Sequence, residues 1–225
     1  MSTTFNPEFA EILSEAFSNC GIRPQTVTSE HIDEAIRSAN LGLLKFSNRG
    51  VKQYQLVFKQ LSLVAGTASY SLPADTLDIW AATILCDGAE TPIWPISRLD
   101  YMNIPKKTTT GRGYNYFVDK GKTGTTQRQV YIWPTPDRST DVINYWAWTR
   151  NADQNDLNQT SPVAYEWIDA YATEIAARLA LKYAPDRLAT LVPMAEAAFI
   201  FAKEANRERA PVRFKMRGYV KTRAW

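Results

Sequence analysis

The sequence is poor in the residue types on which most enzymes and metal centres depend. It has two cysteines, Cys20 and Cys86, and one histidine, His31, among 225 residues. The cysteines lack the spacing of a metal-ligand set, and no Cys–His or Ser–His–Asp group can be assembled without His31. His31 lies in the first turn of a predicted helix, where we expect a capping or surface role. We therefore predict that the protein is not an enzyme and has no catalytic residue, cofactor or metal site.

Long apolar runs are missing as well. No stretch of about 18 apolar residues occurs, so we expect no membrane-spanning helix. The first residues, MSTTFNPEFAEI, have no basic segment followed by an apolar one, so no secretory signal is visible. With only two cysteines, a disulfide-rich secreted protein is not favoured. We expect both cysteines to be reduced thiols in a core, in a cytosolic or capsid setting.

The apolar content of 45% and charged content of 22% are ordinary for a globular protein, but the charge is distributed unevenly. The net charge is +3. Residues 207–225, which we call the arm, hold seven Lys and Arg against a single acid, Glu208. The other 206 residues, the body, hold 19 Lys and Arg against 22 Asp and Glu. A slightly acidic body with a basic arm is typical of a segment that binds a partner.

Apolar residues at helical spacing predict helices at both ends of the body. In segment 1–50, one helix should begin with Asn6 as its cap and Pro7 at its first position, and it should stop near Gly21. A second helix should run from about Thr28 to Gly50. In segment 151–206, Ser161-Pro162 should start a helix that ends before Pro185.

A last helix in segment 151–206 contains a proline. Asp186 can cap this helix, and Pro193 lies within the apolar pattern that follows. Because proline cannot donate the helical hydrogen bond, either the helix kinks there or it begins near Leu191.

The residue pattern of segment 51–150 predicts β-strands. Short runs of alternating or continuous apolar residues predict seven strands, and Asp87-Gly88 is a hairpin-turn dipeptide. The connections look too short for helical crossovers, so we expect antiparallel pairing. Residues 106–126 are rich in Gly, Thr and Lys, and we expect a mobile loop around one short strand. The predicted strands cover residues 55–63, 68–72, 79–85, 93–96, 114–118, 129–133 and 142–148.

These patterns predict an α+β fold: N- and C-terminal helices form one bundle, packed with an antiparallel β-sheet domain, and an extended C-terminal arm follows. The arm carries cations and aromatic side chains together, which suits docking onto another protein. The residues that we expect to dock are Arg213, Phe214, Lys215, Arg217, Tyr219, Lys221, Arg223 and Trp225.

Several motifs follow one another in a particular order. The motifs are YSLPAD at 70–75, IWPISRLDY at 93–101, YIWPTPD at 131–137, a strand with Tyr145 and Trp148, and then Pro162 before a helix with Ala176, Leu179, Ala180, Lys182 and Tyr183. This order resembles the head-to-tail adaptor proteins of tailed bacteriophages, especially the tail tubular protein A and short-tailed-phage adaptor group. The resemblance covers about residues 7–206.

The resemblance implies a structural virion protein at the capsid vertex, assembled in the host cytoplasm. Such adaptors form a ring, commonly of twelve copies, beneath the portal protein. The ring extends the channel through which genomic DNA passes without sequence-specific binding, and it offers a platform for the downstream tail or nozzle protein. In several adaptors a C-terminal arm reaches into the portal, and here the matching segment is 207–225. We expect the free protein to be monomeric or weakly associated.

Other functions remain open at this point. A nucleic-acid-binding protein could use the basic, aromatic arm directly, since such residues bind single strands by charge and stacking. Against this, the body is acidic and contains none of the usual nucleic-acid modules. A membrane-surface arm is disfavoured because no amphipathic helix extends past Gly218.

Overall fold

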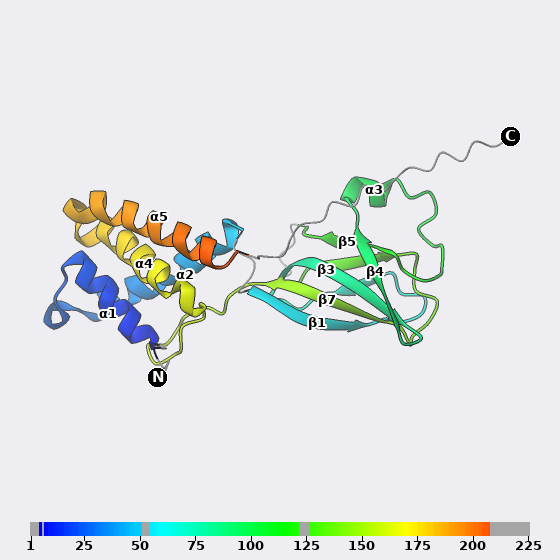
Figure 1. Cartoon of the computed structure of the whole chain (residues 1–225), viewed down its shortest axis with the longest axis horizontal. Coiled ribbons are helices and arrows are strands. Elements are labelled where there is room, and N and C mark those ends of the chain that lie inside the picture. Colours follow the sequence, from blue (N-terminus) through cyan, green and yellow to red (C-terminus); the bar gives the residue numbers. More distant parts are fainter. Residues whose placement is uncertain (1–4, 6, 51–54, 122–126, 208–225) are drawn as a thin grey trace.

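The computed structural model describes residues 5, 7–50, 55–121 and 127–207, and these form an elongated body with a helical bundle at one end and a curled sheet at the other (Figure 1). Two separate clusters of buried side chains underlie the two ends, one within the bundle and one against the sheet. The predicted α+β class is confirmed. The domain boundaries stay a prediction.

Four helices from the two ends of the body form the bundle: α1 (Phe9–Cys20), α2 (Ser29–Asn48), α4 (Ile168–Tyr183) and α5 (Leu188–Ala205). Helix α4 contacts the other three and buries nearly its whole length, from Ala170 to Ala180. Its many alanines allow the neighbouring helices to approach closely. The 3₁₀ turns η1 (Pro24–Thr26), η3 (Tyr165–Trp167) and η4 (Pro185–Arg187) lie beside the helix ends.

Two predicted helix starts are wrong, and the hydrogen bonds near each start explain why. Helix α1 begins at Phe9, so Pro7 lies before it, and Asn6 is outside the described residues. The Phe9 N–H donates to the carbonyl of Gln159 at 3.0 Å, which satisfies a free helix-end donor without a capping side chain. Ser161 does not cap α4, because its hydroxyl accepts from the N–H of Val163 only two residues on.

Helix α5 follows directly after η4 and starts at Leu188, so the expected start near Leu191 is wrong. Pro193 lies inside the helix. It falls within the first two turns, where its missing N–H removes a single intrahelical bond.

The seven strands of the described residues form one sheet in the order β1-β7-β3-β4-β5-β6-β2. All seven predicted strands are confirmed, with small shifts at their ends. Their bounds are β1 (Leu56–Ser62), β2 (Ser69–Ser71), β3 (Thr76–Cys86), β4 (Ala89–Pro95), β5 (Asn115–Asp119), β6 (Gln129–Trp133) and β7 (Val142–Thr149).

The strand pairing is antiparallel with one exception. Strands β4 and β5 are parallel, with Trp94 opposite Asn115 and Pro95 opposite Tyr116. The expectation of purely antiparallel pairing was therefore wrong. The connection between these strands, which carries the short helix α3 (Arg98–Met102), is long enough for a parallel crossover.

The turn between β3 and β4 is the hairpin that Asp87-Gly88 predicts. Cys86 pairs with Ala89 across it, and Asp87 and Gly88 have φ of 49° and 79°. Both central residues of a type I′ turn need positive φ, which Asp and Gly tolerate.

The first part of the predicted mobile loop is hydrogen-bonded to the chain after β6. The Gly111 N–H donates to the carbonyl of Thr135 at 2.9 Å, and the Thr135 N–H donates to the carbonyl of Thr109 at 2.9 Å. Residues 122–126 lie outside the described residues. Mobility of 106–126 therefore stays a prediction.

Buried and partly buried polar contacts join the bundle to the sheet. The Gln55 amide donates to the Ser47 hydroxyl of α2 at 3.1 Å, and its oxygen accepts from the Trp148 indole of β7 at 2.7 Å. The Asn40 side chain of α2 donates to the carbonyl of Gln154 at 2.9 Å and accepts its N–H at 2.8 Å. Helix α2 is therefore hydrogen-bonded to both chain segments that connect the bundle with the sheet.

Candidate interaction surfaces

The two thiols are buried and free, as predicted. Burial raises the pKa of Cys20 to about 11, and its Sγ donates to the carbonyl of Ala176 at 3.2 Å. Burial, together with the neighbouring Asp141 carboxylate, raises the pKa of Cys86 to about 11 as well. Both thiols keep their protons at neutral pH, so neither is a ready nucleophile or metal ligand.

His31 has the predicted capping role. Its N–H donates to the hydroxyl of Thr28 at 3.4 Å, and its Nδ1 accepts from the Thr28 N–H at 3.1 Å. Its ring lies 4.5 Å from that of Tyr183, between centroids. Throughout the described part of the chain, no group of three or more His, Cys, Asp or Glu is placed to hold a metal ion.

None of the helices that the structure describes is both long and apolar enough to cross a bilayer.

The predicted docking residues, from Arg213 to Trp225, all lie outside the described residues. What the structure does place is the base of the arm. Helix α5 ends at Ala205, and Asn206 and Arg207 follow as the last described residues. The position of α5 therefore determines where the arm starts.

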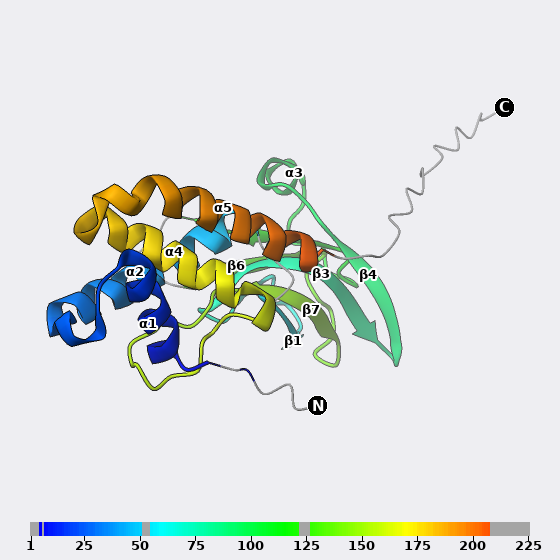
Figure 2. The same cartoon turned by 60° about the vertical axis from the view of Figure 1, so that its left-hand side comes forward.

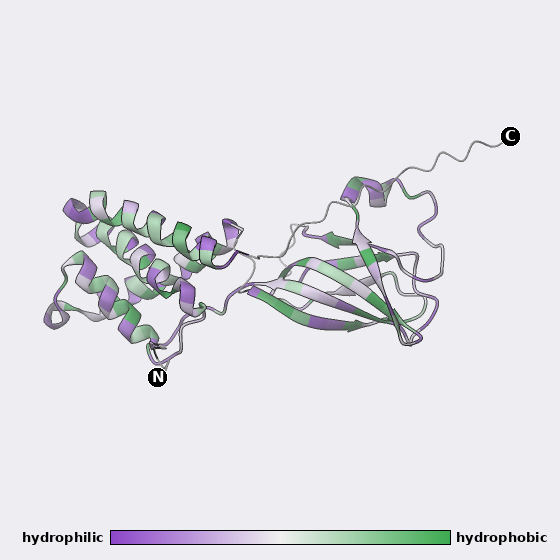
Figure 3. Ribbon diagram, viewed as in Figure 1, coloured by the Kyte–Doolittle hydropathy of each residue, from purple (hydrophilic) through white to green (hydrophobic). Residues whose placement is uncertain are grey.

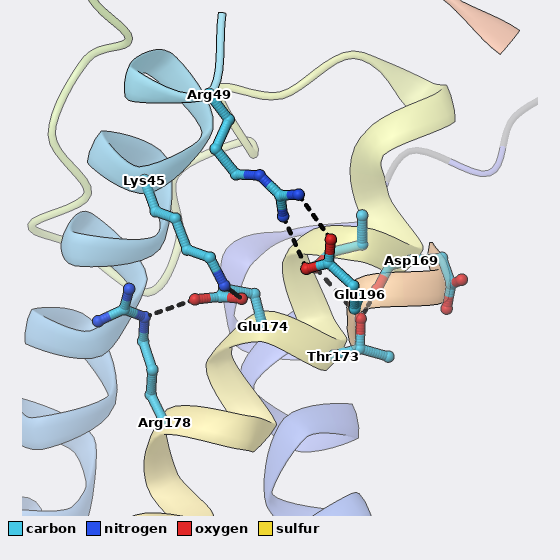
Figure 4. Close-up of polar contacts among 8 residues, drawn as sticks. Lys45, Arg49, Asp169, Thr173, Glu174, Arg178 and Glu196 are labelled. Atoms are coloured by element: carbon cyan, nitrogen blue, oxygen red, sulfur yellow. Dashed lines mark hydrogen bonds and ion pairs between the residues drawn. The ribbon is translucent and has the colours of Figure 1, made fainter. Parts of the chain in front are cut away.

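Helix α5 is fixed to α2 by Arg49 (Figure 4). The guanidinium donates to both carboxylate oxygens of Glu196, at 2.7 and 2.5 Å, and its central carbon lies 3.8 Å from the ring centroid of Phe199. The hydrogen bonds from Arg49 lower the pKa of Glu196. A bidentate, stacked arginine holds a partner in one orientation better than a lysine could.

Helix α4 is joined to α2 by a second set of ion pairs in the same view (Figure 4). The carboxylate of Glu174 is buried, with 5% of the residue exposed. It accepts from Lys45 of α2 at 2.6 Å and from Arg178, one turn further along α4, at 2.8 Å. Two cations thus compensate one buried anion, which would otherwise be costly to keep in the bundle.

Most of these charged contacts join residues that are far apart in the sequence. The Glu174–Arg178 spacing of four residues is a readable helix pair. By contrast, the partners Lys45 and Glu174, or Arg49 and Glu196, lie far apart in the sequence, and only the packing of α2 on α4 and α5 brings them together.

The outer side of α5 exposes large apolar side chains, and hydrophobic residues recur along most of the helix (Figure 3). The side chain of Phe201 is the most exposed of them, at 69%. A helix that is apolar on more than one side is usually covered by another element. The exposed apolar residues of the α4–α5 hairpin are Leu181, Val192, Met194, Ile200 and Phe201.

The outer face of the sheet carries exposed aromatic side chains. Phe58 of β1 and Trp146 of β7 are paired across the strands, with ring centroids 5.5 Å apart. Trp80 and Trp94 are also about half exposed. Next to the aromatic pair, Asn144 accepts from Gln60 at 2.9 Å and donates to Glu90, forming a polar ladder across the sheet.

Two grooves on the described surface differ in charge. The first, about 830 Å³, lies between α2 and the sheet, and we call it the basic groove. Its charged residues are Arg37, Lys120, Arg128, Arg150, Asp33 and Asp153. The second, about 770 Å³, lies between α1 and the start of α4, and we call it the acidic groove. Its lining has an apolar floor and four carboxylates but no cation. The lining residues are Phe5, Pro7, Ile12, Tyr165, Ile168, Ala172, Ser14, Glu11, Glu15, Glu166 and Asp169.

Comparison with known families gives a match over most of the chain. A family model described as SU10 adaptor protein matches residues 9–217. The matched range includes the bundle, the sheet and the first part of the arm, so Arg213 and Phe214 lie inside it and Tyr219 and Trp225 lie beyond it. Among the curated proteins, none matches the chain.

Proposed function

Because this chain belongs to the SU10 adaptor protein family, a family of phage head-to-tail adaptors, we propose that it forms the ring that docks on the portal and receives the tail. Family membership makes it a structural adaptor protein and a virion component. The ring of twelve copies, the portal contact through the arm and the extended DNA channel are our proposal. The downstream tail protein as the next partner also belongs to that proposal.

The observation that carries the proposal is the family match, which runs from α1 into the arm. The charge distribution supports a protein partner for the arm. The arm has seven Lys and Arg against one acid, while the body is net acidic. A segment that orders on binding needs strong anchors to offset its lost conformational entropy. Aromatic side chains such as Phe214 and Trp225, with arginines beside them, are the residues that most often act as such anchors.

The exposed apolar side of α5 supports ring formation. In a closed ring each copy uses two different surfaces, one for each neighbour. Met194, Ile200 and Phe201 offer one such surface on an otherwise well-packed bundle. The outer aromatic face of the sheet, at the other end of the body, is our candidate platform for the tail protein (Figure 1).

The proposal is tested with a chain that ends at Asn206. Binding of this truncated chain to portal rings should be lost, while its circular dichroism spectrum and melting temperature should match those of the full chain. A matched control keeps the arm but replaces Arg138 on the sheet surface by Ala, and it should load normally. If the truncated chain still loads onto portal rings as the full chain does, portal docking through the arm is wrong.

Direct nucleic-acid binding by the arm is the alternative that the arm's composition favours. It predicts that the isolated protein binds single-stranded DNA with a steep dependence on salt. The adaptor proposal predicts weak binding, since the DNA only passes through the channel. An affinity series across salt concentrations, with the chain ending at Asn206 as control, separates the two.

A further inference from the structure

The acidic groove is an apolar groove that no described segment covers. Its floor is formed by Ile12 of α1 and Ile168 of α4, and its edges include Phe5 and Tyr165, which are 68% and 67% exposed. Exposed aromatic rings around a concave apolar surface of about 770 Å³ are the usual features of a peptide-binding site.

The carboxylates of this groove have no cationic partners among the described residues. Glu11, Glu15, Glu166 and Asp169 are exposed, and none of them forms an ion pair with another described residue. Three other carboxylates of the bundle, those of Glu34, Glu174 and Glu196, each pair with a described cation. The groove therefore suits an occupant that brings both aromatic side chains and positive charge.

The arm of this chain has that chemistry, and it starts near the groove. Helices α4 and α5 run antiparallel, so the end of α5 lies at the same end of the bundle as the start of α4 (Figures 1 and 2). Trp167, just before α4, lies 5.4 Å from Phe199, near the end of α5, between ring centroids. Residues 208–225 can extend up to roughly 60 Å, about twice the length of a 20-residue helix. The arm can therefore reach the groove of its own molecule.

We infer that, before the protein meets the portal, the arm of each molecule docks into its own acidic groove. Aromatic side chains such as Phe214 and Trp225 bind the apolar floor, and the arginines pair with the carboxylates. The same segment on a second copy could supply the same chemistry, but the tethered arm has the higher effective concentration. The basic groove does not suit the arm, because four Lys and Arg against two Asp line it.

Protection of the arm from trypsin tests this inference in the full chain without portal. Trypsin cuts after Arg213, Lys215 and Arg217, and intact-mass analysis reads the rate of arm cleavage separately from cuts elsewhere. The test variant neutralises the groove with Glu11→Gln, Glu15→Gln, Glu166→Gln and Asp169→Asn. Cleavage of a docked segment follows the fraction of molecules in which it is released, so we expect the variant's arm to be cut about tenfold faster.

A control variant removes the same number of negative charges away from the groove. Its substitutions are Glu30→Gln, Asp33→Asn, Asp137→Asn and Asp186→Asn. All four side chains are exposed, so the fold should be kept. Arm cleavage in the control should stay within about twofold of the unmodified chain, because distant surface charges are screened by salt.

Salt and protein concentration complete the test, even if the groove variant folds poorly. In the unmodified chain, higher salt should speed arm cleavage, because screening weakens the pairs with the carboxylates. Equal cleavage rates in the unmodified chain and the groove variant, with no effect of salt, would overturn the inference. Protection that rises with protein concentration would also overturn it, since the arm would then come from a second copy. No portal is present, so loss of portal binding by the truncated chain neither confirms nor contradicts this result.

Discussion

An aromatic cluster lies in the interior of the bundle, whereas an aromatic pair lies on the outer face of the sheet. In the bundle, Phe46, Trp167 and Phe199 meet in the interior, with ring centroids 5.4 to 5.5 Å apart. On the sheet, Phe58 and Trp146 meet edge to face on the outer surface, and both residues are about half exposed. The bundle aromatics therefore hold the helices together, whereas the outer sheet aromatics contribute less to folding and remain available to a partner.

The ion pairs of the bundle and the sheet also differ in burial. Glu174 of the bundle is buried between two cations, while Arg138 and Asp87 of the sheet form a pair with side chains 57% and 75% exposed. Buried charges depend on their partners far more than exposed ones do. The positions of the bundle helices, and with them the start of the arm, thus depend on contacts inside the bundle. Substitutions in the bundle core should therefore destabilise the protein more than substitutions on the sheet surface.

Removing the bundle aromatics should be the most damaging change. We expect Phe199→Ala to lower the free energy of unfolding by about 3–5 kcal/mol, because it opens a cavity between Phe46 and Trp167. Chemical denaturation measures the loss. Phe201→Ala, two residues away on the exposed side of α5, is the matched control and should change stability by less than about 0.5 kcal/mol. Equal losses for both variants would contradict the assignment of the two faces.

Leaving Glu174 without its cations should be the next largest effect. The double variant Lys45→Met and Arg178→Met buries an uncompensated carboxylate, and we expect a loss of about 3 kcal/mol at neutral pH. The loss should shrink when Glu174→Gln is added to the double variant, because the uncompensated charge is then gone. The sheet counterpart, Arg138→Met, should cost less than about 0.5 kcal/mol. A loss that stays the same after Glu174→Gln is added would point to packing rather than charge.

Truncating the aromatic pair on the sheet should have a modest effect on folding. We expect Trp146→Ala to lower the free energy of unfolding by about 1 kcal/mol, since its contact with Phe58 is exposed to solvent on one side. If the sheet face receives the tail protein, the same variant should weaken that binding by more than about tenfold. Unchanged tail binding, measured by calorimetry on assembled rings, would remove this face from the candidate platform.

Both thiols should contribute to the loss of folding stability at alkaline pH, and this effect should be smaller than those of the substitutions above. The pKa of Cys20 and that of Cys86 are each about 11 in the folded chain, against about 8.5 for an unfolded thiol. Between these values only the unfolded state releases the protons, so stability is full below the unfolded pKa and falls as the pH rises toward 11.

Melting temperatures measured from neutral to alkaline pH follow this loss. Cys20→Ala and Cys86→Ala should each make the alkaline decline shallower, one in the bundle and one in the sheet. Identical pH profiles for the variants and the unmodified chain would show that other groups set the alkaline limit.

Periodicity and turn chemistry were sufficient to predict most of the fold. The helices at both ends of the body, the seven strands and the Asp87-Gly88 hairpin all follow from local patterns. The parallel pairing of β4 with β5 did not, because it depends on the path of the chain between them. Nor could the start of α4 be predicted, since Ser161 uses its hydroxyl in a local turn instead of capping the helix.

The candidate surfaces were only partly readable from the sequence. The arm stands out by charge alone, because Arg213, Lys215 and Arg217 follow one another without an acid between them. The acidic groove could not be predicted, since it joins the N-terminal helix to a helix that begins near residue 168. Sites formed by packing distant helices leave no local pattern in a single sequence.

In our proposal the free chain becomes a ring only on the portal, through its arm. Native mass spectrometry of the portal, alone and mixed with the chain, tests this assembly step. We predict that the free chain has the mass of a monomer and that the portal gains a fixed number of copies, with no gain when the chain ends at Asn206. A stable ring of the chain in free solution, or the same gain with the truncated chain, would contradict the claim.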